Sequence, residues 1–458
     1  MLISVNPANG QEIARTPLMD APEIDRALEA AVGAQRAWSR APISSRSSLL
    51  IEIAKVLRQR APSLANIITA EMGKPLAEAA AEIEKCAVCC DFYAENAAQF
   101  LAEIDTKSNA TDSYVVLDPL GVVLAIMPWN YPFWQLFRFA APALVAGNGI
   151  AIKHASNVQQ CAAAFVAILK DAGMPPGLAC NLRIESAGVA AIIDDPRIAA
   201  VTLTGSTEVG SVVAAQAGRV LKKQVLELGG SDPFIVLADA DIDAAARTAV
   251  KARFQNAGQS CIAAKRFIVE DRVADAFVAG LCKGVEALVI GDPMAPATSI
   301  GPMARDSFRA DLEKLIDRSV AAGAKMLLGG RRIEGAGFFF APTVLDHVTP
   351  DMDVFQKETF GPVAAVIRVP NAEAAVQLAN ATEFGLGAAL WTADLERARE
   401  IARQIEAGAV FINGLVASDA RLPFGGVKRS GYGRELGLYG LREFTNVKTV
   451  WIGPVKAA

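Results

Sequence analysis

Apolar residues recur at three- and four-residue spacing through the first hundred positions, with charged residues between them. This period predicts amphipathic helices, which we place at 22–38, 46–61 and 76–101. From about Thr111 the pattern changes to short β-branched runs that glycine, proline and further helical stretches separate: SYVVL, GVVLAIM, GIAIK, ACNLRI, AAVTLT and FIVLA. Strands that alternate with helices predict βαβ units and a mostly parallel sheet.

A second alternating set follows Glu227 and predicts a second α/β domain. Its apolar runs are KRFIV, KMLLGG, FFFAPTVL, PVAAVIRV, GAALWT and GAVFIN. The tail TNVKTVWIG predicts a terminal strand without a hairpin partner beside it. Such an edge commonly pairs with another element of the chain or with another subunit.

Composition narrows the possible functions. A length of 458 residues, 52% hydrophobic and 21% charged, predicts a large core in two or three domains. The net charge of -4, without a basic cluster, argues against nucleic-acid binding. The first residues lack the basic and apolar regions of a secretory leader, and no apolar run approaches the roughly 20 residues of a membrane helix. We therefore expect a soluble cytoplasmic protein without a membrane partner.

The residues that most often bind metals, histidine and cysteine, are few or scattered along the sequence. Two histidines, His154 and His347, leave little material for a metal site or a Ser-His-Asp triad. Seven cysteines, an odd number, are typical of reduced thiols in the cytoplasm. Cys86, Cys89 and Cys90 resemble a metal motif, but no second CxxC follows and their spacing is helical. We interpret them as buried apolar residues and predict no metal site.

Three segments combine glycine with polar residues in apolar surroundings: IMPWNYP around Asn130, VLELGGSDP around Glu227, and FQNAGQSCIAAKR around Cys261. Cys261 is the cysteine in a glycine-rich polar loop, where a thiolate can act as a nucleophile. A structural role is the alternative for a single cysteine. The ordinary dinucleotide fingerprint is absent, because GNG and GLG each lack the third glycine.

These segments resemble the aldehyde dehydrogenase superfamily, and the resemblance covers essentially the whole chain. It includes TLTGSTEVG at 202–210, ELGG at 227–230, GQSC at 258–261, ETFGP at 358–362 and PFGGVKRSGYGREL at 423–436. The resemblance implies an α/β fold with two Rossmann-like doubly wound domains and a small β oligomerisation domain. The implied ranges are 1–108 and 120–229 for cofactor binding, 230–435 for catalysis, and 109–119 with 436–458 for assembly into a homodimer or homotetramer.

The same resemblance implies the catalytic roles. Cys261 attacks the aldehyde, and Asn130 with the backbone N–H of Cys261 stabilises the oxyanion. Glu227 activates the water that hydrolyses the thioester, a task that needs a raised carboxyl pKa. Two alternatives stay open: Asn130 as a cap of the following helix, and Glu227 as a surface residue at the end of a strand.

For the cofactor, the resemblance implies NADP or NAD, bound by Trp129, Lys153, Ser156, Gly205, Ser206, Glu358 and Phe360. Many NAD-preferring relatives have a glutamate where this chain has Ser156. A serine does not repel the 2′-phosphate of NADP and Lys153 attracts it, so we predict that NADP is preferred and NAD accepted. The alternative is that Ser156 only caps the helix starting near Asn157.

Trp134 and Arg138 lie four residues apart in the apolar stretch after Asn130 and share one helix face. A buried arginine is costly unless it finds an anion, and its shape suits a carboxylate. Succinate-semialdehyde dehydrogenases are similar here, which implies that Trp134, Arg138 and Ser418 bind the substrate, succinate semialdehyde. The alternative substrates are glutarate semialdehyde or a broader range of aldehydes. The alternative role for Arg138 is structural, as the partner of an acid in the core or at an interface.

Overall fold

The computed structural model describes residues 1–454. The chain begins with an antiparallel hairpin of β1 (Leu2–Asn6) and β2 (Gln11–Thr16), which the sequence pattern did not predict. The helices α1 (Ala21–Trp38), α2 (Ile43–Met72) and α3 (Leu76–Phe100) confirm the three predicted ones, although α2 continues well past its predicted end. It does so through Pro62, because the apolar spacing resumes with buried Leu64 and Ile68 beyond it.

The first large sheet has the strand order β17-β9-β8-β5-β6-β7, parallel except for the pair β17 and β9. Its strands are β5 (Val122–Met127), β6 (Gly149–His154), β7 (Ala179–Asn181), β8 (Ile198–Thr204), β9 (Lys223–Glu227) and β17 (Gly431–Tyr432). Successive residues of β5 alternate between two cores: Val123 packs with α2 to α5, and Leu124 packs with α1 and α7. Helices therefore cover both faces, through α4 (Trp134–Ala146), α5 (Gln159–Asp171), α6 (Val189–Asp194) and α7 (Thr207–Arg219).

The second large sheet has the order β12-β13-β14-β11-β10-β15-β16. All its neighbouring strands are parallel except the edge pair of β12 with β13, which is antiparallel. Its strands are β10 (Asp232–Val236), β11 (Ala264–Glu270), β12 (Lys325–Leu328), β13 (Thr343–Asp346), β14 (Val363–Val369), β15 (Gly387–Trp391) and β16 (Ala409–Ile412). Phe267 and Ile268 of β11 enter different cores, so this sheet is also covered on both faces. The covering helices include α8 (Ile242–Phe254), α9 (Asp271–Glu286), α10 (Asp306–Ala321), α12 (Ala372–Asn380) and α13 (Leu395–Ala402).

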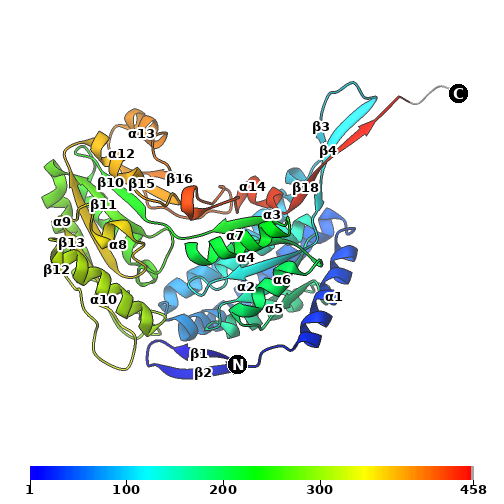
Figure 1. Cartoon of the computed structure of the whole chain (residues 1–458), viewed down its shortest axis with the longest axis horizontal. Helices are drawn as coiled ribbons and strands as arrows, with labels where there is room; N and C mark the ends of the chain where they lie inside the picture. Colours follow the sequence, from blue (N-terminus) through cyan, green and yellow to red (C-terminus); the bar gives the residue numbers. More distant parts are fainter. Residues whose placement is uncertain (455–458) are drawn as a thin grey trace.

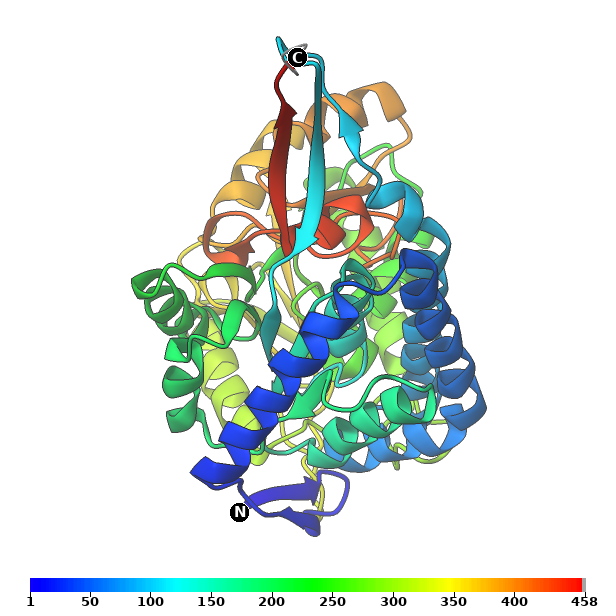
Figure 2. The same ribbon diagram turned by 90° about the vertical axis from the view of Figure 1, so that its right-hand side faces the viewer.

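A small sheet of β3 (Ile104–Asp105), β4 (Asp112–Pro119) and β18 (Thr445–Ile452) projects from the rest of the molecule (Figure 1). The predicted terminal strand is confirmed as β18, which pairs with β4 along its whole length. Figure 2 shows these two strands side by side, although they are more than three hundred residues apart in sequence.

The segment boundaries differ from the predicted ranges at three places. β3 lies inside 1–108 yet joins the projecting sheet, and β17 lies inside 230–435 yet joins the first large sheet. α14 (Gly437–Glu443) lies inside 436–458, but Leu441 packs in the core with α3 and α4. Strand pairing holds β3 to β4 and β17 to β9, and apolar packing holds α14. Residues 455–458 lie outside the described part. The division into cofactor-binding, catalytic and oligomerisation domains stays a prediction.

Among the helices of residues 1–454, none combines the length and apolarity that a bilayer crossing requires. The predicted burial of Cys86, Cys89 and Cys90 is confirmed, because all three side chains are fully buried in α3.

Candidate active site

The carboxyl ends of the parallel strands in the first sheet carry most of the predicted site. Asn130 follows β5, Ser206 follows β8, and Glu227 ends β9. Such ends share one edge of a doubly wound sheet, where ligands of these folds bind. Cys261 approaches from the second sheet, in the loop before β11, and lines one cavity together with Asn130 and Ser206. The site therefore lies between the two large sheets.

A tight turn precedes Cys261. Asn256, Ala257 and Gly258 have φ values of 53°, 52° and 71°, in the left-handed region that favours glycine. A Cβ on Gly258 would lie 2.3 Å from the carbonyl oxygen of Gly361, so only glycine fits there. The Asn256 amide donates 2.9 Å to the carbonyl oxygen of Asn130, which offsets strain in the turn and ties it to the end of β5.

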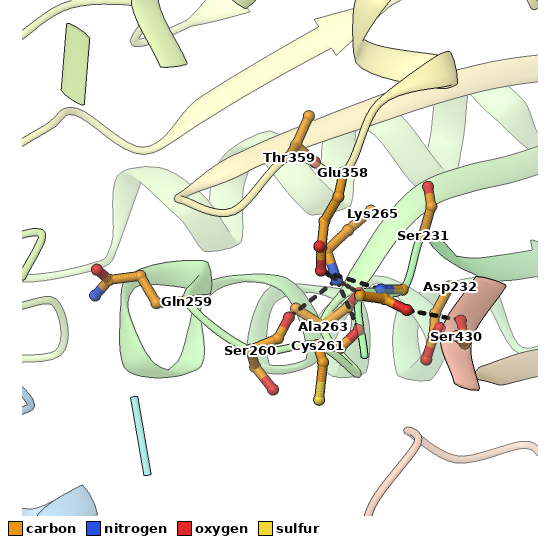
Figure 3. A network of polar contacts seen from close by, with 12 residues as sticks. Ser231, Asp232, Gln259, Ser260, Cys261, Ala263, Lys265, Glu358, Thr359 and Ser430 are labelled. Carbon is orange, nitrogen blue, oxygen red and sulfur yellow. Dashed lines mark hydrogen bonds and ion pairs between the residues drawn. The ribbon is translucent and has the colours of Figure 1, made fainter. Parts of the chain in front are cut away.

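Lys265 holds the same loop from behind. Its buried ammonium donates to the carbonyl oxygens of Ser260, at 2.9 Å, and Cys261, at 2.7 Å. It also pairs with Glu358 at 3.4 Å, whose carboxylate accepts the backbone N–H of Gly230 at 3.1 Å. Figure 3 shows this network, with the sulfur of Cys261 pointing away from the ammonium group. The backbone of the nucleophile candidate is thus fixed while its sulfur faces the cavities.

The Cys261 thiol is half-buried, and burial raises its pKa to about 12. The positive charges of Arg138 and Lys265 oppose this shift only in part. The resting group is therefore a protonated thiol, and a base must remove its proton before it can attack an aldehyde.

The Asn130 side chain is buried beside Cys261. Its amide nitrogen donates 3.0 Å to the carbonyl oxygen of Gln259, and its oxygen accepts from the Gln135 amide at 3.0 Å. These bonds orient the amide nitrogen toward the loop of Cys261. Asn130 does not cap α4, whose cap position is Phe133 and has no side-chain hydrogen bond, so the capping alternative is wrong.

Glu227 is 2% exposed, which excludes the alternative of a surface residue. Burial and the charge of Glu435 raise its pKa well above the ordinary value, against the opposing charges of Arg138 and Arg434. Among residues 1–454 its carboxylate oxygens have no hydrogen-bond partner. It does not line the cavities that contain Cys261, so its side chain must turn to reach the sulfur.

An outer cavity of about 340 Å³ brings together seven of the predicted residues. Its lining includes Trp129, Asn130, Gly205, Ser206, Glu358 and Phe360, together with Cys261. Ser206 is the N-cap of α7, so the N-terminus of that helix faces the cavity. Helix N-termini favour phosphate groups because their backbone N–H groups are unpaired and the helix dipole is positive there.

An edge cavity of about 590 Å³ contains the other two predicted cofactor residues, Lys153 and Ser156. Arg305 also lines it and donates to the Ser156 hydroxyl at 3.3 Å. Burial lowers the pKa of Lys153 and of Arg305, and the positive charge of Arg305 lowers that of Lys153 further. Ser156 does not cap the next helix, because the cap of α5 is Val158 and lacks a side-chain bond. The edge cavity is thus suited to an anion.

An inner cavity of about 260 Å³ contains Cys261 and the predicted residues Trp134, Arg138 and Ser418. The indole N–H of Trp134 donates 3.0 Å to the Ser418 hydroxyl. Arg138 is 2% exposed and pairs with the Glu435 carboxylate, and its guanidinium lies 4.6 Å from the ring centre of Phe424. The alternative of a paired Arg138 is therefore observed, and the same arginine also lines the cavity.

Sequence reasoning missed Lys85, Lys265, Arg305 and Glu435. Lys85 could have been found from its spacing. It lies three residues after Glu82 and four before Cys89, so it shares the buried face of α3 with them. Arg305 and Glu435 carried no such signal, since their partners Ser156 and Arg138 are distant in sequence. Lys265 lies only four residues after Cys261, but the sequence pattern does not show that its ammonium turns back to the loop.

Comparisons with known proteins agree with this geometry. The profile of the aldehyde dehydrogenase family matches residues 2–450. The succinate semialdehyde dehydrogenase [NAD(P)+] Sad of Escherichia coli is 48% identical over 449 residues, which are 98% of this chain and 97% of that protein. A probable succinate-semialdehyde dehydrogenase [NADP(+)] of Synechocystis is 48% identical over 451 residues, 98% and 99% of the two chains.

Solved structures have the same fold. The succinic semialdehyde dehydrogenase of Streptococcus pyogenes, in complex with NADP+, superposes with a TM-score of 0.97 at 35% identity. The alignment covers 99% of this chain and 100% of that one. Gox0499 has a TM-score of 0.97 at 42% identity, with 99% and 100% covered.

Proposed function

The chain belongs to the aldehyde dehydrogenase family, and from this premise we propose that it oxidises succinate semialdehyde to succinate with NADP, and less efficiently with NAD. One observation carries the proposal. Cys261 lines both the outer and the inner cavity, so one sulfur faces the cofactor residues on one side and the donors of Trp134, Arg138 and Ser418 on the other. Two relatives at 48% identity are named succinate-semialdehyde dehydrogenases, which supports the same activity for this chain.

The first step forms a bond between the Cys261 sulfur and the aldehyde carbon. The thiol proton leaves to solvent, and the carbonyl electrons move onto the oxygen. The Asn130 amide and the backbone N–H of Cys261 are the donors for that oxyanion, and the loss of one such donor costs about 3 kcal/mol of transition-state stabilisation. The tetrahedral carbon then releases a hydride and becomes a thioester of Cys261.

The second step is hydrolysis. A water molecule attacks the thioester carbon, its proton goes to Glu227, and the Cys261 sulfur leaves. The raised pKa of Glu227 makes its carboxylate a stronger base than an exposed glutamate. Succinate is released, and the balance is one aldehyde, one water and one oxidised cofactor to one carboxylate, one reduced cofactor and two protons.

NADP supplies the hydride acceptor when it is bound, and the residues present fit it. Glu358 and Phe360 line the outer cavity beside Cys261, and the N-terminus of α7 faces the same space. Lys153, Ser156 and Arg305 form a cationic, donor-rich end in the edge cavity, which suits a 2′-phosphate. Trp129 stacks on Phe308, at 5.3 Å between ring centres, and this pair forms part of the wall of the outer cavity.

The substrate assignment is tested with pairs of aldehydes that differ in the distal carboxylate. We expect a much higher kcat/KM for succinate semialdehyde than for butanal, and a higher value with NADP than with NAD. Glutarate semialdehyde tests the alternative of a longer acid, and an aromatic aldehyde tests a broad range. Equal kcat/KM for the charged and uncharged four-carbon aldehydes would refute the proposed substrate.

We also propose a homodimer or homotetramer in the cytoplasm. β18 is an edge strand, and its Val447 and Trp451 are 64% and 53% exposed on the projecting sheet. Exposed apolar side chains on an unpaired edge favour association with a second copy. The seven cysteines are free thiols, as in a reducing compartment. Sedimentation of the wild type and of Val447→Asp tests the assembly, which the substitution should weaken.

A further inference from the structure

Lys85 of α3 is a half-buried cation in the inner cavity that the catalytic steps do not use. Its ammonium donates 2.7 Å to the Ser418 hydroxyl and lies 4.3 Å from the ring centre of Trp134. Burial and the charge of Arg138 lower its pKa to about 8. A bound anion stabilises the charged form of a partly buried ammonium group, because the anion offsets the hydration that burial removes.

The acids around Lys85 have other partners, including Glu78, which lines the same cavity and accepts the backbone N–H of Asn256. Glu82 pairs with Lys74 and accepts the backbone N–H groups of Phe133 and Trp134. Asp419 forms an ion pair with Arg421 at 2.6 Å. Within residues 1–454, Lys85 forms no ion pair with a carboxylate, so its charge is available to a ligand.

Ser418 adds a directed donor to this cation. Its oxygen accepts from Lys85 at 2.7 Å and from the Trp134 indole at 3.0 Å. A hydroxyl has two lone pairs and one hydrogen, so with both lone pairs used it can only donate to a further group. Lys85 keeps two of its three N–H donors beyond the bond to Ser418. The cluster therefore presents donors without a free acceptor.

Two other cations line this cavity: Lys251, which is exposed and whose charge acts on Glu78, and Arg138, which is compensated. Glu435 pairs with its Nε, and the Thr204 hydroxyl lies 3.3 Å from its Nη2. The net charge that the inner cavity offers to an anion therefore comes from Lys85 rather than from the arginine.

We infer that Lys85, with the Ser418 hydroxyl, binds the distal carboxylate of the substrate and sets the preference for ω-carboxyl aldehydes. This inference rests on the proposed function. It makes Lys85 a specificity-determining residue, whereas Arg138 contributes shape and a secondary donor.

The test compares Lys85→Met with the wild type on succinate semialdehyde and butanal, with thermal melting to show that each variant is folded. Methionine keeps the length and packing over Trp134 and removes the charge. We expect the KM for succinate semialdehyde to rise roughly tenfold or more, and the KM for butanal to stay within about twofold. Lys85→Arg should recover most of the preference. Lys55→Met, which removes an exposed cation of α2, is the matched control and should match the wild type.

Binding of succinate gives a readout apart from turnover, because its dissociation constant, from calorimetry, should rise with Lys85→Met in the same proportion. If Lys85→Met keeps both the wild-type preference and the wild-type affinity for succinate, the assignment of Lys85 is overturned while the proposed function stands. Equal KM increases for both aldehydes also overturn it, since they indicate a packing role. If the wild type itself does not prefer succinate semialdehyde to butanal, the proposed function fails and the inference fails with it.

Discussion

The ammonium of Lys265 donates a 2.7 Å hydrogen bond to the backbone carbonyl of Cys261, the residue that we assign as the nucleophile. The same ammonium pairs with Glu358 of the outer cavity. A single buried lysine thus connects the loop that carries the sulfur to a carboxylate that faces the cofactor space. The orientation of the nucleophile therefore depends on a residue that does not touch the reacting atoms.

Replacing Lys265 with methionine removes these bonds and leaves Glu358 without its cation. We expect kcat to fall by about 10² because the sulfur loses its fixed direction, while the KM for aldehyde changes little. Single-turnover kinetics of cofactor reduction measure the effect. Lys357→Met, at an exposed lysine of the neighbouring loop, is the control, and an unchanged single-turnover rate in Lys265→Met would contradict the positioning role.

Arg138 and Glu435 form a buried pair, so removal of one partner leaves an uncompensated charge or forces a proton onto the acid. We expect Arg138→Met to lower the free energy of unfolding by about 3–5 kcal/mol. The double variant Arg138→Met with Glu435→Leu should recover part of that loss. Urea denaturation of both variants measures it, and additive losses would show that the pair is not coupled.

The edge cavity predicts the cofactor preference. Ser156→Glu places a carboxylate beside Lys153 and Arg305, where it pairs with them and repels a 2′-phosphate. We expect the affinity for NADP to fall roughly tenfold or more and that for NAD to stay similar. Titration of tryptophan fluorescence with each cofactor measures binding without turnover. A wild type with at least tenfold higher kcat/KM for NAD than for NADP would refute the preference itself.

The raised pKa of Glu227 predicts the pH dependence of hydrolysis. The base form is the carboxylate, and a raised pKa means that protonation removes it at a higher pH than for an exposed glutamate. The deacylation rate should therefore fall as the pH decreases through that raised pKa. Glu227→Gln should remove this dependence and slow deacylation by about 10²–10⁴, visible as a burst of reduced cofactor followed by slow turnover. A burst-free variant with a wild-type pH profile would exclude Glu227 as the base.

Local patterns were sufficient for much of the fold. The helical spacing of Cys86 and Cys90 predicted their burial in α3, and strands that alternate with helices predicted two mostly parallel α/β sheets. The hairpin of β1 and β2 was missed because it is short, partly exposed and polar at its turn. β17 was missed because two residues carry no period.

The site was predictable as a set of residues but not as a set of contacts. Asn130 and Ser206 line one cavity because each follows a strand of the same parallel sheet, and parallel topology gathers carboxyl ends at one edge. The pairing of Arg138 with Glu435, and of Arg305 with Ser156, depends on segments distant in sequence. Such pairs are set by tertiary packing, for which a single sequence carries no signal.

The most direct measurement is the mass of the peptide that contains Cys261, after Glu227→Gln enzyme is mixed with succinate semialdehyde and NADP and quenched with acid. The slowed hydrolysis of this variant should trap a succinyl group on Cys261, with one reduced cofactor formed for each acylated site. Cys261→Ser should give neither the adduct nor the reduced cofactor, whereas Cys282→Ser should give both. Sustained cofactor reduction by Cys261→Ser, or an acyl group on another residue, would contradict the assignment of Cys261 as the nucleophile.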